Sequence, residues 1–390
     1  MADDDTPPRL KLGMVGGGRG AFIGDAHRIA ARLDDRYELV AAAPSSDPLV
    51  AFASGRDLRL PEDRVYTKFA AMAQAEAVRD DGIDVVSVVT PNHLHHPVCT
   101  AFLEAGIDVI CDKPLAMTLA EAREIVATAD EAGRFLGVTY TYTGYPMVRE
   151  ARALIEAGAI GAVRQVHTEF AIGWLAAPVE QDNPSKQAAW RTDPEQSGAS
   201  FVVADLGTHC FHLTEFVTGL ELAALTADLE TFVPGRQLED HANLLLRYTG
   251  GARGILWVSM VAAGEDVGLR LRVYGEKGHL AWEQGQPNEL RLAPYGEPVR
   301  TLVRGGAGLS PAAQRATRMI AGLPEGYYEA FATLYRDYAD VLTARRDGSE
   351  PEPLALWAPT GADGARGLAF VEAALKSHAD GGTWVDFTGA

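Results

Sequence analysis

The pattern of hydrophobic and polar positions divides the chain into two parts that differ in predicted secondary structure. Up to about residue 140, short apolar runs alternate with helix-compatible stretches, which is typical of a doubly wound parallel sheet. The strands are predicted at 10–15, 37–43, 83–89, 107–111 and 135–140. The helices are predicted at 25–33, 97–105 and 118–132, with Asn92 as a candidate cap for the second and Thr118 with Glu121 as a candidate capping box for the third.

Beyond residue 140 the pattern changes from strand–helix alternation to runs of strands. A helix over 146–157 ends at Gly158, and strands are predicted at 163–172, 222–233, 242–248, 252–258 and 269–273. Two further helices are predicted at 324–346 and 360–378. This predicts an α+β domain over 141–390 with a large, mostly antiparallel open sheet, and leaves open whether its C-terminal helices pack back on the first domain. Residues 1–9 are acidic and proline-bearing, and we expect a disordered leader there.

Length, charge and cysteine content narrow the class of protein. A chain of 390 residues exceeds one ordinary core, which also favours two domains. The formal charge of −18 disfavours nucleic acid and anionic membranes as partners, and no apolar run approaches the roughly 20 residues of a membrane span. The three cysteines, Cys99, Cys111 and Cys210, lack CxxC spacing. They therefore argue against a disulfide framework or structural zinc, and favour a reducing, cytoplasmic compartment.

A glycine-rich turn separates the first strand from the first helix. Residues 16–21 read Gly-Gly-Gly-Arg-Gly-Ala, in the strand–turn–helix context that a dinucleotide-binding fingerprint requires. Glycine lets the backbone turn tightly and lets a pyrophosphate approach the amides at the helix N-terminus. Two registers fit: Gly16 and Gly18 with Ala21, or Gly16 and Gly18 with a later Gly24 and a longer loop. The turn predicts a Rossmann-type domain over 10–140.

The end of the second strand does not decide between NAD and NADP. Dinucleotide folds usually carry an acid there for the adenosine ribose hydroxyls, whereas this chain has Pro44-Ser45-Ser46-Asp47. The acid is missing or displaced. The two serines are able to accept a 2′-phosphate, but no arginine is adjacent in the sequence to clamp it.

The central strand, 107–111, runs directly into Asp112, Lys113 and Pro114. Ligands of open α/β sheets bind outside the carboxyl ends of the strands, so Asp112 and Lys113 stand where a ligand would lie. Pro114 stops the strand, and because X-Pro bonds tolerate the cis form it is a candidate for an unusual turn. The alternative is an ordinary surface lysine beside a strand end.

Two polar clusters remain. His93, His95 and His96 invite a metal interpretation, but without acidic or cysteine partners nearby a polar loop over a cofactor is the better interpretation, and no metal is expected. In the second domain, Asp205 and His209 lie at i and i+4 and would share a face of an α-helix, so that the carboxylate would hold the imidazole for general base chemistry. The alternative there is a helix-capping aspartate and a core histidine.

Taken in order, these motifs resemble the glucose–fructose oxidoreductase/inositol dehydrogenase/rhizopine catabolism (Gfo/Idh/MocA) family. They are the glycine turn, Thr90-Pro91-Asn92, Asp112-Lys113-Pro114, Asp205-x-x-x-His209 and the hairpin turn Gly275-Glu276-Lys277-Gly278. The similarity runs from about Leu10 to at least Gly278. The chain departs from the family in having Asp112 where a glutamate is common, a longer glycine loop and no acid after the second strand.

The resemblance implies an NAD(P)-dependent dehydrogenase that oxidises a secondary hydroxyl of a sugar, sugar derivative or cyclitol, assembled as a homodimer or homotetramer. By position, Lys113, Asp205 and His209 would be catalytic; whether His209 or Lys113 accepts the proton stays open. The expected cofactor-binding residues are Gly16, Gly18, Arg19, Ala21, Phe22, Ile23, Ser45, Ser46, Thr90, Pro91, Asn92, His95, Asp112, Lys113, Trp190 and Arg191. The expected substrate-binding residues are Lys113, Tyr142, Arg191, Asp205, His209 and His212.

Three alternatives stand beside this interpretation. The first is an NADPH-dependent reductase of keto sugars, which the segment after the second strand does not exclude. The second is a regulator that binds dinucleotide without catalysis, against which the joint presence of Lys113, Asp205 and His209 argues. The third is a structural subunit of a larger complex, for which the sequence offers no positive feature.

Overall fold

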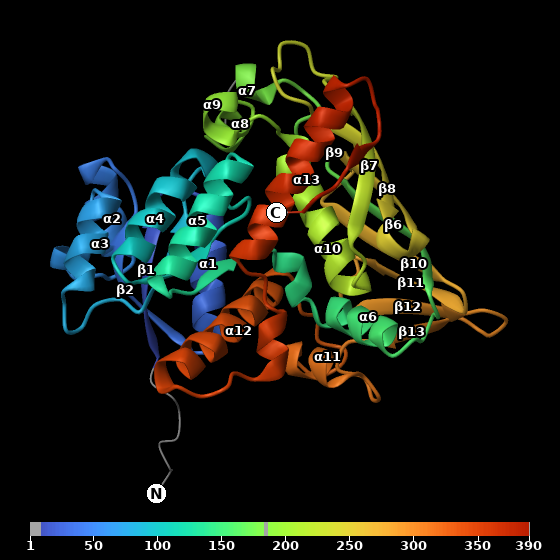
Figure 1. Cartoon of the computed structure of the whole chain (residues 1–390). Coiled ribbons are helices and arrows are strands. Elements are labelled where there is room, and N and C mark those ends of the chain that lie inside the picture. The colour runs from blue at the N-terminus through green and yellow to red at the C-terminus, as the bar shows by residue number, and fades with distance from the viewer. Residues whose placement is uncertain (1–8, 183–185, 390) are drawn as a thin grey trace, which may run out of the picture.

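Within the described residues, five strands form the parallel sheet of the first half of the chain (Figure 1). The strands are β1 (Leu10–Gly16), β2 (Tyr37–Ala43), β3 (Val85–Val89), β4 (Asp108–Cys111) and β5 (Leu136–Val138), in the order β2-β1-β3-β4-β5. All five residues of β3 are buried, as expected for a central strand covered on both faces. The predicted doubly wound sheet is confirmed. Its last strand is shorter than expected because the chain passes through Thr139 and Tyr140 into a short 3₁₀ helix, η3 (Thr141–Gly144).

Helices connect these strands and cover the sheet. They are α1 (Ile23–Leu33), α2 (Pro48–Asp57), α3 (Phe69–Ala77), α4 (His95–Glu104) and α5 (Leu119–Ala132), with short 3₁₀ turns η1 (Glu62–Arg64) and η2 (Asn92–Leu94). The capping box of Thr118 and Glu121 is confirmed at the start of α5. The prediction that Asn92 caps α4 is wrong, because Asn92 opens η2 and its side-chain amide donates to the Ser197 carbonyl at 3.2 Å.

Nine strands form the second sheet, which is mostly antiparallel as predicted. They are β6 (Val163–Ala171), β7 (Leu222–Glu230), β8 (His241–Tyr248), β9 (Arg253–Ser259), β10 (Gly268–Gly275), β11 (Gly278–Glu283), β12 (Glu289–Pro294), β13 (Arg300–Val303) and β14 (Val385–Asp386), in the order β13-β12-β11-β10-β6-β9-β8-β7-β14. Only β6 and β9 pair in parallel among the described strands of this sheet. Buried and more exposed residues alternate along β8, so one face of the sheet is covered and the other is open.

The covered face of the second sheet carries helices from several parts of the chain (Figure 1). These are α6 (Pro146–Glu156), α10 (Thr208–Thr218), α11 (Pro311–Ala316) and α13 (Gly361–Ala379). Short helices α7 (Val179–Asp182), α8 (Lys186–Arg191) and α9 (Pro194–Ser197) stand above the gap between the two sheets, and a π-helix, η4 (Val203–Gly207), leads into α10. The turns η5 (Thr249–Gly251) and η6 (Pro353–Trp357) complete the secondary structure.

The C-terminal helices return to the first sheet, which answers the question that the sequence leaves open. Helix α12 (Tyr327–Asp347) packs against α1 and buries Phe331, Tyr335 and Tyr338 in the same cluster as β1. The Tyr335 hydroxyl lies 2.7 Å from His27 Nδ1 and 2.6 Å from Ser87 Oγ. Helix α13 contacts both α5 and β7. The two sheets are therefore joined by shared helices as well as by chain connections.

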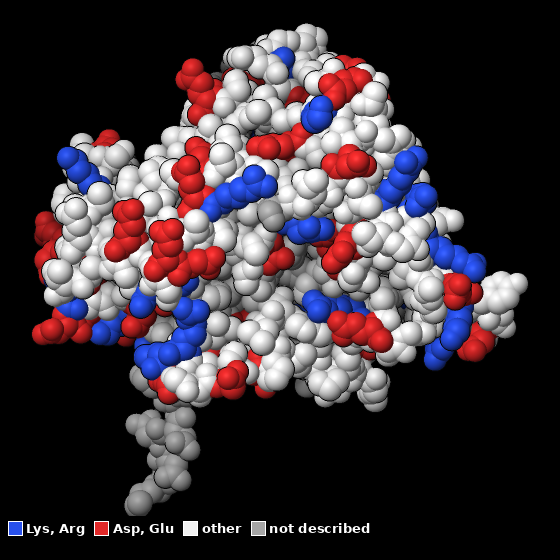
Figure 2. Space-filling view, in the orientation of Figure 1, with Lys and Arg blue, Asp and Glu red and all other residues white. Residues whose placement is uncertain are grey.

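The computed structural model describes residues 9–182 and 186–389, so nearly all of the expected leader, residues 1–8, lies outside the described residues. Acidic and basic side chains are interspersed on the face shown in Figure 2. Within the described ranges, every helix is too short or too polar to cross a bilayer.

Candidate active site

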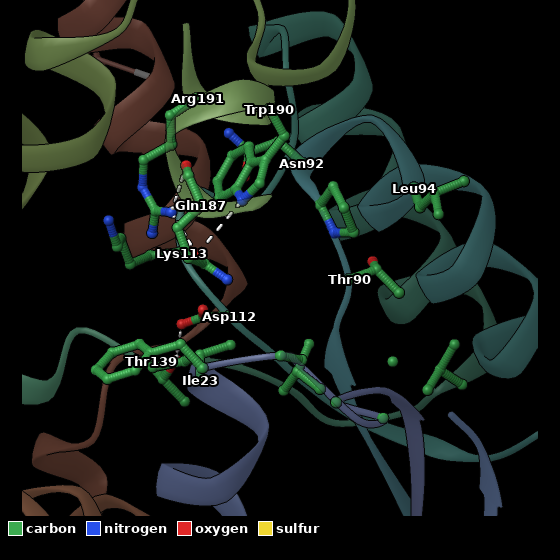
Figure 3. A pocket seen from close by; sticks show the side chains of 18 of the residues that line it. Ile23, Thr90, Asn92, Leu94, Asp112, Lys113, Thr139, Gln187, Trp190 and Arg191 are labelled. Carbon is green, nitrogen blue, oxygen red and sulfur yellow. Dashed lines mark hydrogen bonds between the residues drawn. The ribbon is translucent and has the colours of Figure 1, made fainter. Parts of the chain in front are cut away.

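A cavity of about 590 Å³ lies between the carboxyl ends of the parallel strands and the second sheet. The first sheet contributes Gly16 from β1, Thr90 after β3, and Asp112 with Lys113 after β4. The second half contributes Asp205 and residues of α8, α10 and β6. Figure 3 shows side chains from both halves turned toward this space. The strand ends thus meet where the sequence predicts a ligand.

The glycine turn brings backbone close to backbone at three points. A Cβ on Gly16, whose φ is +86°, would lie 2.7 Å from the Val89 carbonyl oxygen. A Cβ on Gly18 would lie 2.6 Å from the Pro44 carbonyl oxygen. Gly24, in the first turn of α1, would meet the Gly17 Cα at 2.5 Å. Since close helix–strand packing is the role of the last fingerprint glycine, the structure favours the register with Gly24 over the one with Ala21.

The N-terminus of α1 faces the cavity without a side-chain cap. Phe22 precedes the helix and no side chain caps it, while Ala21, Phe22 and Ile23 all line the cavity. Arg28 Nη1 donates to the Gly17 carbonyl at 2.8 Å and fixes the turn from behind. Uncapped amides at a helix N-terminus, reached through a glycine turn, fit the pyrophosphate of a dinucleotide.

The end of β2 lines the cavity with Pro44, Ser45 and Ser46. Asp47, the displaced acid, is used elsewhere: its carboxylate accepts from the Leu49 amide at 2.8 Å and the Val50 amide at 3.3 Å, and so caps α2. No carboxylate from this strand end lines the cavity within the described part of the chain.

The loop after β3 places Thr90, Pro91 and Asn92 in the cavity wall, but not His95. The His95 side chain is buried behind the loop, with Nδ1 2.7 Å from the Pro114 carbonyl and Nε2 2.9 Å from the Thr90 carbonyl. The expectation that His95 contacts the cofactor is therefore corrected. It braces the two loops that carry contact residues, because α4 begins at His95 itself and turns the ring inward.

At the end of β4, Asp112 and Lys113 line the cavity and the Lys113–Pro114 peptide is cis. Asp112 accepts a hydrogen bond from Thr139 Oγ1 at 2.8 Å, and His27 Nε2 lies 3.8 Å from its carboxylate. Burial opposes ionisation of Asp112, but His27, Lys113 and Thr139 outweigh it and lower the pKa to about 2. Asp112 is thus a carboxylate at neutral pH, able to accept from a ribose hydroxyl.

Lys113, Asp205 and Arg191 form a compact charged group at the other end of the cavity. Lys113 Nζ donates to the Asp205 backbone carbonyl at 2.8 Å and also to its carboxylate. Arg191 Nε donates to the second carboxylate oxygen at 3.3 Å. Burial would raise the pKa of Asp205, but the two cations lower it well below the usual range. The three side chains hold one another in fixed positions inside the site.

His209 lines the same cavity, but within the described ranges its Nδ1 donates no hydrogen bond to Asp205. Residues 203–207 form a π-helix rather than the expected α-helix, and both oxygens of the Asp205 carboxylate are occupied by Lys113 and Arg191. The expectation that Asp205 holds the His209 tautomer is therefore wrong. Instead, His209 stands edge-on to Tyr142 with ring centroids 4.8 Å apart and to Tyr140 at 5.8 Å.

The surroundings of His209 keep its ring neutral. Its Nδ1 is buried with no hydrogen-bond partner among the described residues, so Nε2 is the nitrogen that the cavity reaches. Burial, and then the charge of Lys113, lower the pKa of His209 well below the usual value, and the attraction of Asp205 offsets this only in part. An uncharged imidazole at Nε2 is able to accept a proton.

His212 does not reach the cavity, which corrects its expected role in substrate binding. One turn beyond His209 on α10, it stacks on Tyr140 with ring centroids 4.3 Å apart, and its Nε2 lies 3.6 Å from Asp363 of α13. The i+3 spacing carries His212 past the cavity and into the contact between α10 and α13.

The remaining predicted residues from the second half, Tyr142, Trp190 and Arg191, all line the cavity. Figure 3 shows Trp190 and Arg191 on α8 turned toward Lys113, with Gln187 between them. Arg191 Nη1 donates to Gln187 Oε1 at 2.6 Å, and the Arg191 guanidinium lies 4.3 Å from the Trp190 ring centroid.

Several lining residues were not predicted. They are Gly17, Val50, Thr67, Phe69, Leu94, Thr139, Thr141, Phe170, Ile172, Gln187, Leu206, Val267, Gln284 and Tyr327, among others. The sequence does contain a signal for Gln187, because it lies one helical turn before Arg191 and so shares a helix face with that predicted residue. Tyr327 carries none, since it arrives from α12, far along the chain. Within the described ranges, no group of three or more His, Cys, Asp and Glu side chains is arranged to hold a metal ion.

Two family models match the chain. Residues 10–140 match the oxidoreductase family with an NAD-binding Rossmann fold, and residues 148–281 match the GFO/IDH/MocA C-terminal domain.

Similar proteins span the whole chain. An oxidoreductase from Sinorhizobium meliloti is 48% identical, with a TM-score of 0.88 over 97% of this chain and 100% of that one. An inositol dehydrogenase homologue from Azotobacter vinelandii, 39% identical, is solved with NAD⁺ (TM-score 0.93, 98% of each chain) and with NADH and myo-inositol (TM-score 0.90, 97% and 98%). Levoglucosan dehydrogenase from Pseudarthrobacter phenanthrenivorans is 25% identical over 410 aligned positions, 97% of this chain and 98% of that protein.

Proposed function

The chain belongs to the Gfo/Idh/MocA family of NAD-binding oxidoreductases, and from this premise we propose that it oxidises a secondary hydroxyl of an uncharged sugar or cyclitol to the ketone. The observation that carries the proposal is the meeting of Lys113, Asp205 and His209 in one cavity with the glycine turn. The similar proteins named for inositol and levoglucosan support the choice of substrate class.

The residues that would hold the dinucleotide form one continuous wall. Amides of the glycine turn and of α1 would bind the pyrophosphate, and Asp112 would accept from the ribose next to the nicotinamide. When bound, the dinucleotide supplies the acceptor for the hydride that leaves the substrate carbon.

The protein's own side chains handle the proton and the charge on the reacting oxygen. His209 Nε2, neutral in this environment, accepts the hydroxyl proton. The Lys113 ammonium, positioned by Asp205, donates a hydrogen bond to the same oxygen and stabilises the negative charge that develops on it. Because both groups are positioned before substrate arrives, little reorganisation is needed during the reaction.

The charge balance at this end of the cavity favours an uncharged substrate. Lys113 and Arg191 both pair with Asp205, and Asp112 adds a second carboxylate. Among the described lining residues at this end, two cations thus face two anions, which leaves none of these cations in excess to bind a phosphate or carboxylate group. Tyr142, Trp190 and Phe170 add aromatic faces that suit the apolar side of a ring.

The test is a substrate screen with purified protein and either NAD⁺ or NADP⁺, following formation of the reduced cofactor by absorbance. The panel contains inositols, levoglucosan and common monosaccharides, and keto sugars are run with the reduced cofactors in the reverse direction. We expect turnover with at least one neutral polyol, and a loss of about 10²–10³-fold in the Lys113→Ala variant. Dinucleotide binding without turnover on any panel member in either direction would overturn the proposal and favour a non-catalytic regulator.

A further inference from the structure

The adenosine end of the cavity carries one charged side chain, Arg19 of the glycine turn, among the described lining residues. The other lining cations, Lys113 and Arg191, stand at the opposite end with Asp205. The Gly18 amide donates to the Pro44 carbonyl at 3.2 Å, so Arg19 and Ser45 are the next residues on two touching segments. The fold thus supplies the arginine beside the serines that the sequence alone does not show.

That arginine is already engaged by α2. Its Nε and Nη2 donate to the two carboxylate oxygens of Asp57 at 2.6 and 2.8 Å, a bidentate pair, and its backbone amide donates to Ser54 Oγ at 3.1 Å. The pair is solvent-exposed, at 58% for Arg19 and 51% for Asp57. The Arg19 guanidinium holds the pKa of Asp57 below its usual value, so the acid is ionised at neutral pH.

The two cofactors differ at this end by a single group. NADP carries a phosphate on the adenosine ribose where NAD has a hydroxyl, and that phosphate brings between one and two negative charges near neutral pH. A guanidinium fork is suited to bind it in bidentate fashion, but only when its donors are free. Here Asp57 occupies Nε and Nη2, one of the two bidentate edges of the guanidinium, and its negative charge balances that of Arg19.

We propose that Asp57, which does not line the cavity, determines cofactor choice by holding the Arg19 guanidinium in an ion pair, so that the protein prefers NAD(H) over NADP(H). The inference rests on the proposed dinucleotide site and goes beyond it, since that site by itself accepts either cofactor. Ser45 and Ser46 then bind the ribose hydroxyls in place of the acid that dinucleotide folds usually carry there. Asp57 is a positioning residue that acts through Arg19.

The experiment measures dissociation constants for NADH and NADPH by calorimetry, which requires no turnover. We expect wild-type protein to bind NADH more tightly, and Asp57→Asn to bind NADPH about tenfold more tightly than wild type, the contribution of roughly one charge-assisted hydrogen bond. The dissociation constant for NADH, which lacks the phosphate, serves as the internal reference. The gain for NADPH should shrink as salt is raised, because the new contact is exposed.

A double-mutant cycle identifies the cation involved. In the Asp57→Asn background, Arg19→Gln should abolish the gain for NADPH. Retention of the gain would overturn the role of Arg19 and point to Arg56, which lies next to Asp57 in the last turn of α2. The matched control is Asp35→Asn, which removes the acid of another exposed pair, with Arg9 at 2.7 Å, and should leave the ratio of the two constants unchanged.

The outcomes separate this inference from the proposed function. A wild-type preference for NADPH, or an unchanged ratio in Asp57→Asn, would overturn the role of Asp57 while the dinucleotide site stands. Failure of wild-type protein to bind either cofactor would overturn the dinucleotide site itself, and with it both proposals.

Discussion

Two arginine–aspartate contacts stand at opposite ends of one cavity and differ in how much water reaches them. At the chemical end, Asp205 is shared by Lys113 and Arg191, and the side chains of Lys113 and Asp205 are only 14% and 18% exposed. At the adenosine end, Arg19 and Asp57 pair while both are more than half exposed. Charges withdrawn from water interact strongly and lose much when a partner is removed, whereas exposed pairs contribute little. The part-buried group of Lys113, Asp205 and Arg191 is therefore suited to catalysis, and the exposed pair to adjusting preference between similar ligands.

The largest expected effect comes from breaking the part-buried group of Lys113, Asp205 and Arg191. In Asp205→Asn, Lys113 and Arg191 would face each other without the carboxylate that now separates and orients them. We expect turnover on the substrate found in the screen to fall by about 10³-fold, as for the loss of a preorganised electrostatic group. Steady-state kinetics and NADH calorimetry check this, with Asp35→Asn as the charge-matched control. A loss confined to KM would contradict the catalytic role and indicate a substrate-positioning role alone.

The next effect concerns His209 and its dependence on pH. Its pKa lies below the ordinary histidine value, so the ring loses its proton at a lower pH than a free histidine and stays a competent base there. We therefore expect kcat/KM to stay level as pH falls from 8 to the ordinary histidine pKa of about 6.5, and to decline only below it.

Replacement of His209 separates its chemistry from its packing. His209→Ala should lower kcat by about 10²-fold or more. It should also remove the decline of kcat/KM at low pH that we assign to His209. His209→Gln keeps a polar group of similar reach but no base, so it should lose kcat comparably while the protein unfolds near the wild-type temperature. If kcat/KM of either variant still declined at low pH as in the wild type, another group would be the proton acceptor, with Lys113 the first candidate.

The sequence predicts best those parts of the fold and the site that depend on local pattern. Along the parallel sheet, the local pattern determines structure: the apolar run 37–43 predicts β2 to the residue, and Thr118 with Glu121 predicts the start of α5. Asp112 and Lys113 reach the cavity because the ends of parallel strands meet at one edge of the sheet. These inferences need only neighbours in sequence and the general geometry of the fold.

The incorrect site predictions concern residues whose side-chain positions depend on packing between segments far apart in the sequence. His212 and His95 carry polar rings at plausible spacings, but these rings contact Asp363 of α13 and the Pro114 carbonyl and do not line the cavity. The Asp205 carboxylate pairs with Lys113, 92 positions away, rather than with its near neighbour His209. Arg19 and Asp57 lie 38 positions apart, so no spacing rule connects them.

The smallest expected effect would sharpen the comparison at the exposed end. Ser46 lines the cavity where dinucleotide folds usually carry an acid, so Ser46→Asp would restore the usual arrangement. A carboxylate there would accept from the ribose hydroxyls of NADH and repel the phosphate of NADPH. Because the site is open to water, we expect only a several-fold weakening of NADPH binding, at most about tenfold, measured by calorimetry at low salt.

The salt dependence of NADPH binding to Ser46→Asp distinguishes charge repulsion from a distorted loop. Screening should return NADPH affinity toward the wild-type value as salt rises, whereas a distorted loop would weaken both cofactors at every salt concentration. Ser46→Asn is the matched control, since it has the same size without the charge. Equal weakening of NADPH binding by Ser46→Asp and Ser46→Asn would mean that the adenosine end selects its ligand by fit rather than by charge. The exposed end of the cavity would then not act on cofactor choice through electrostatics.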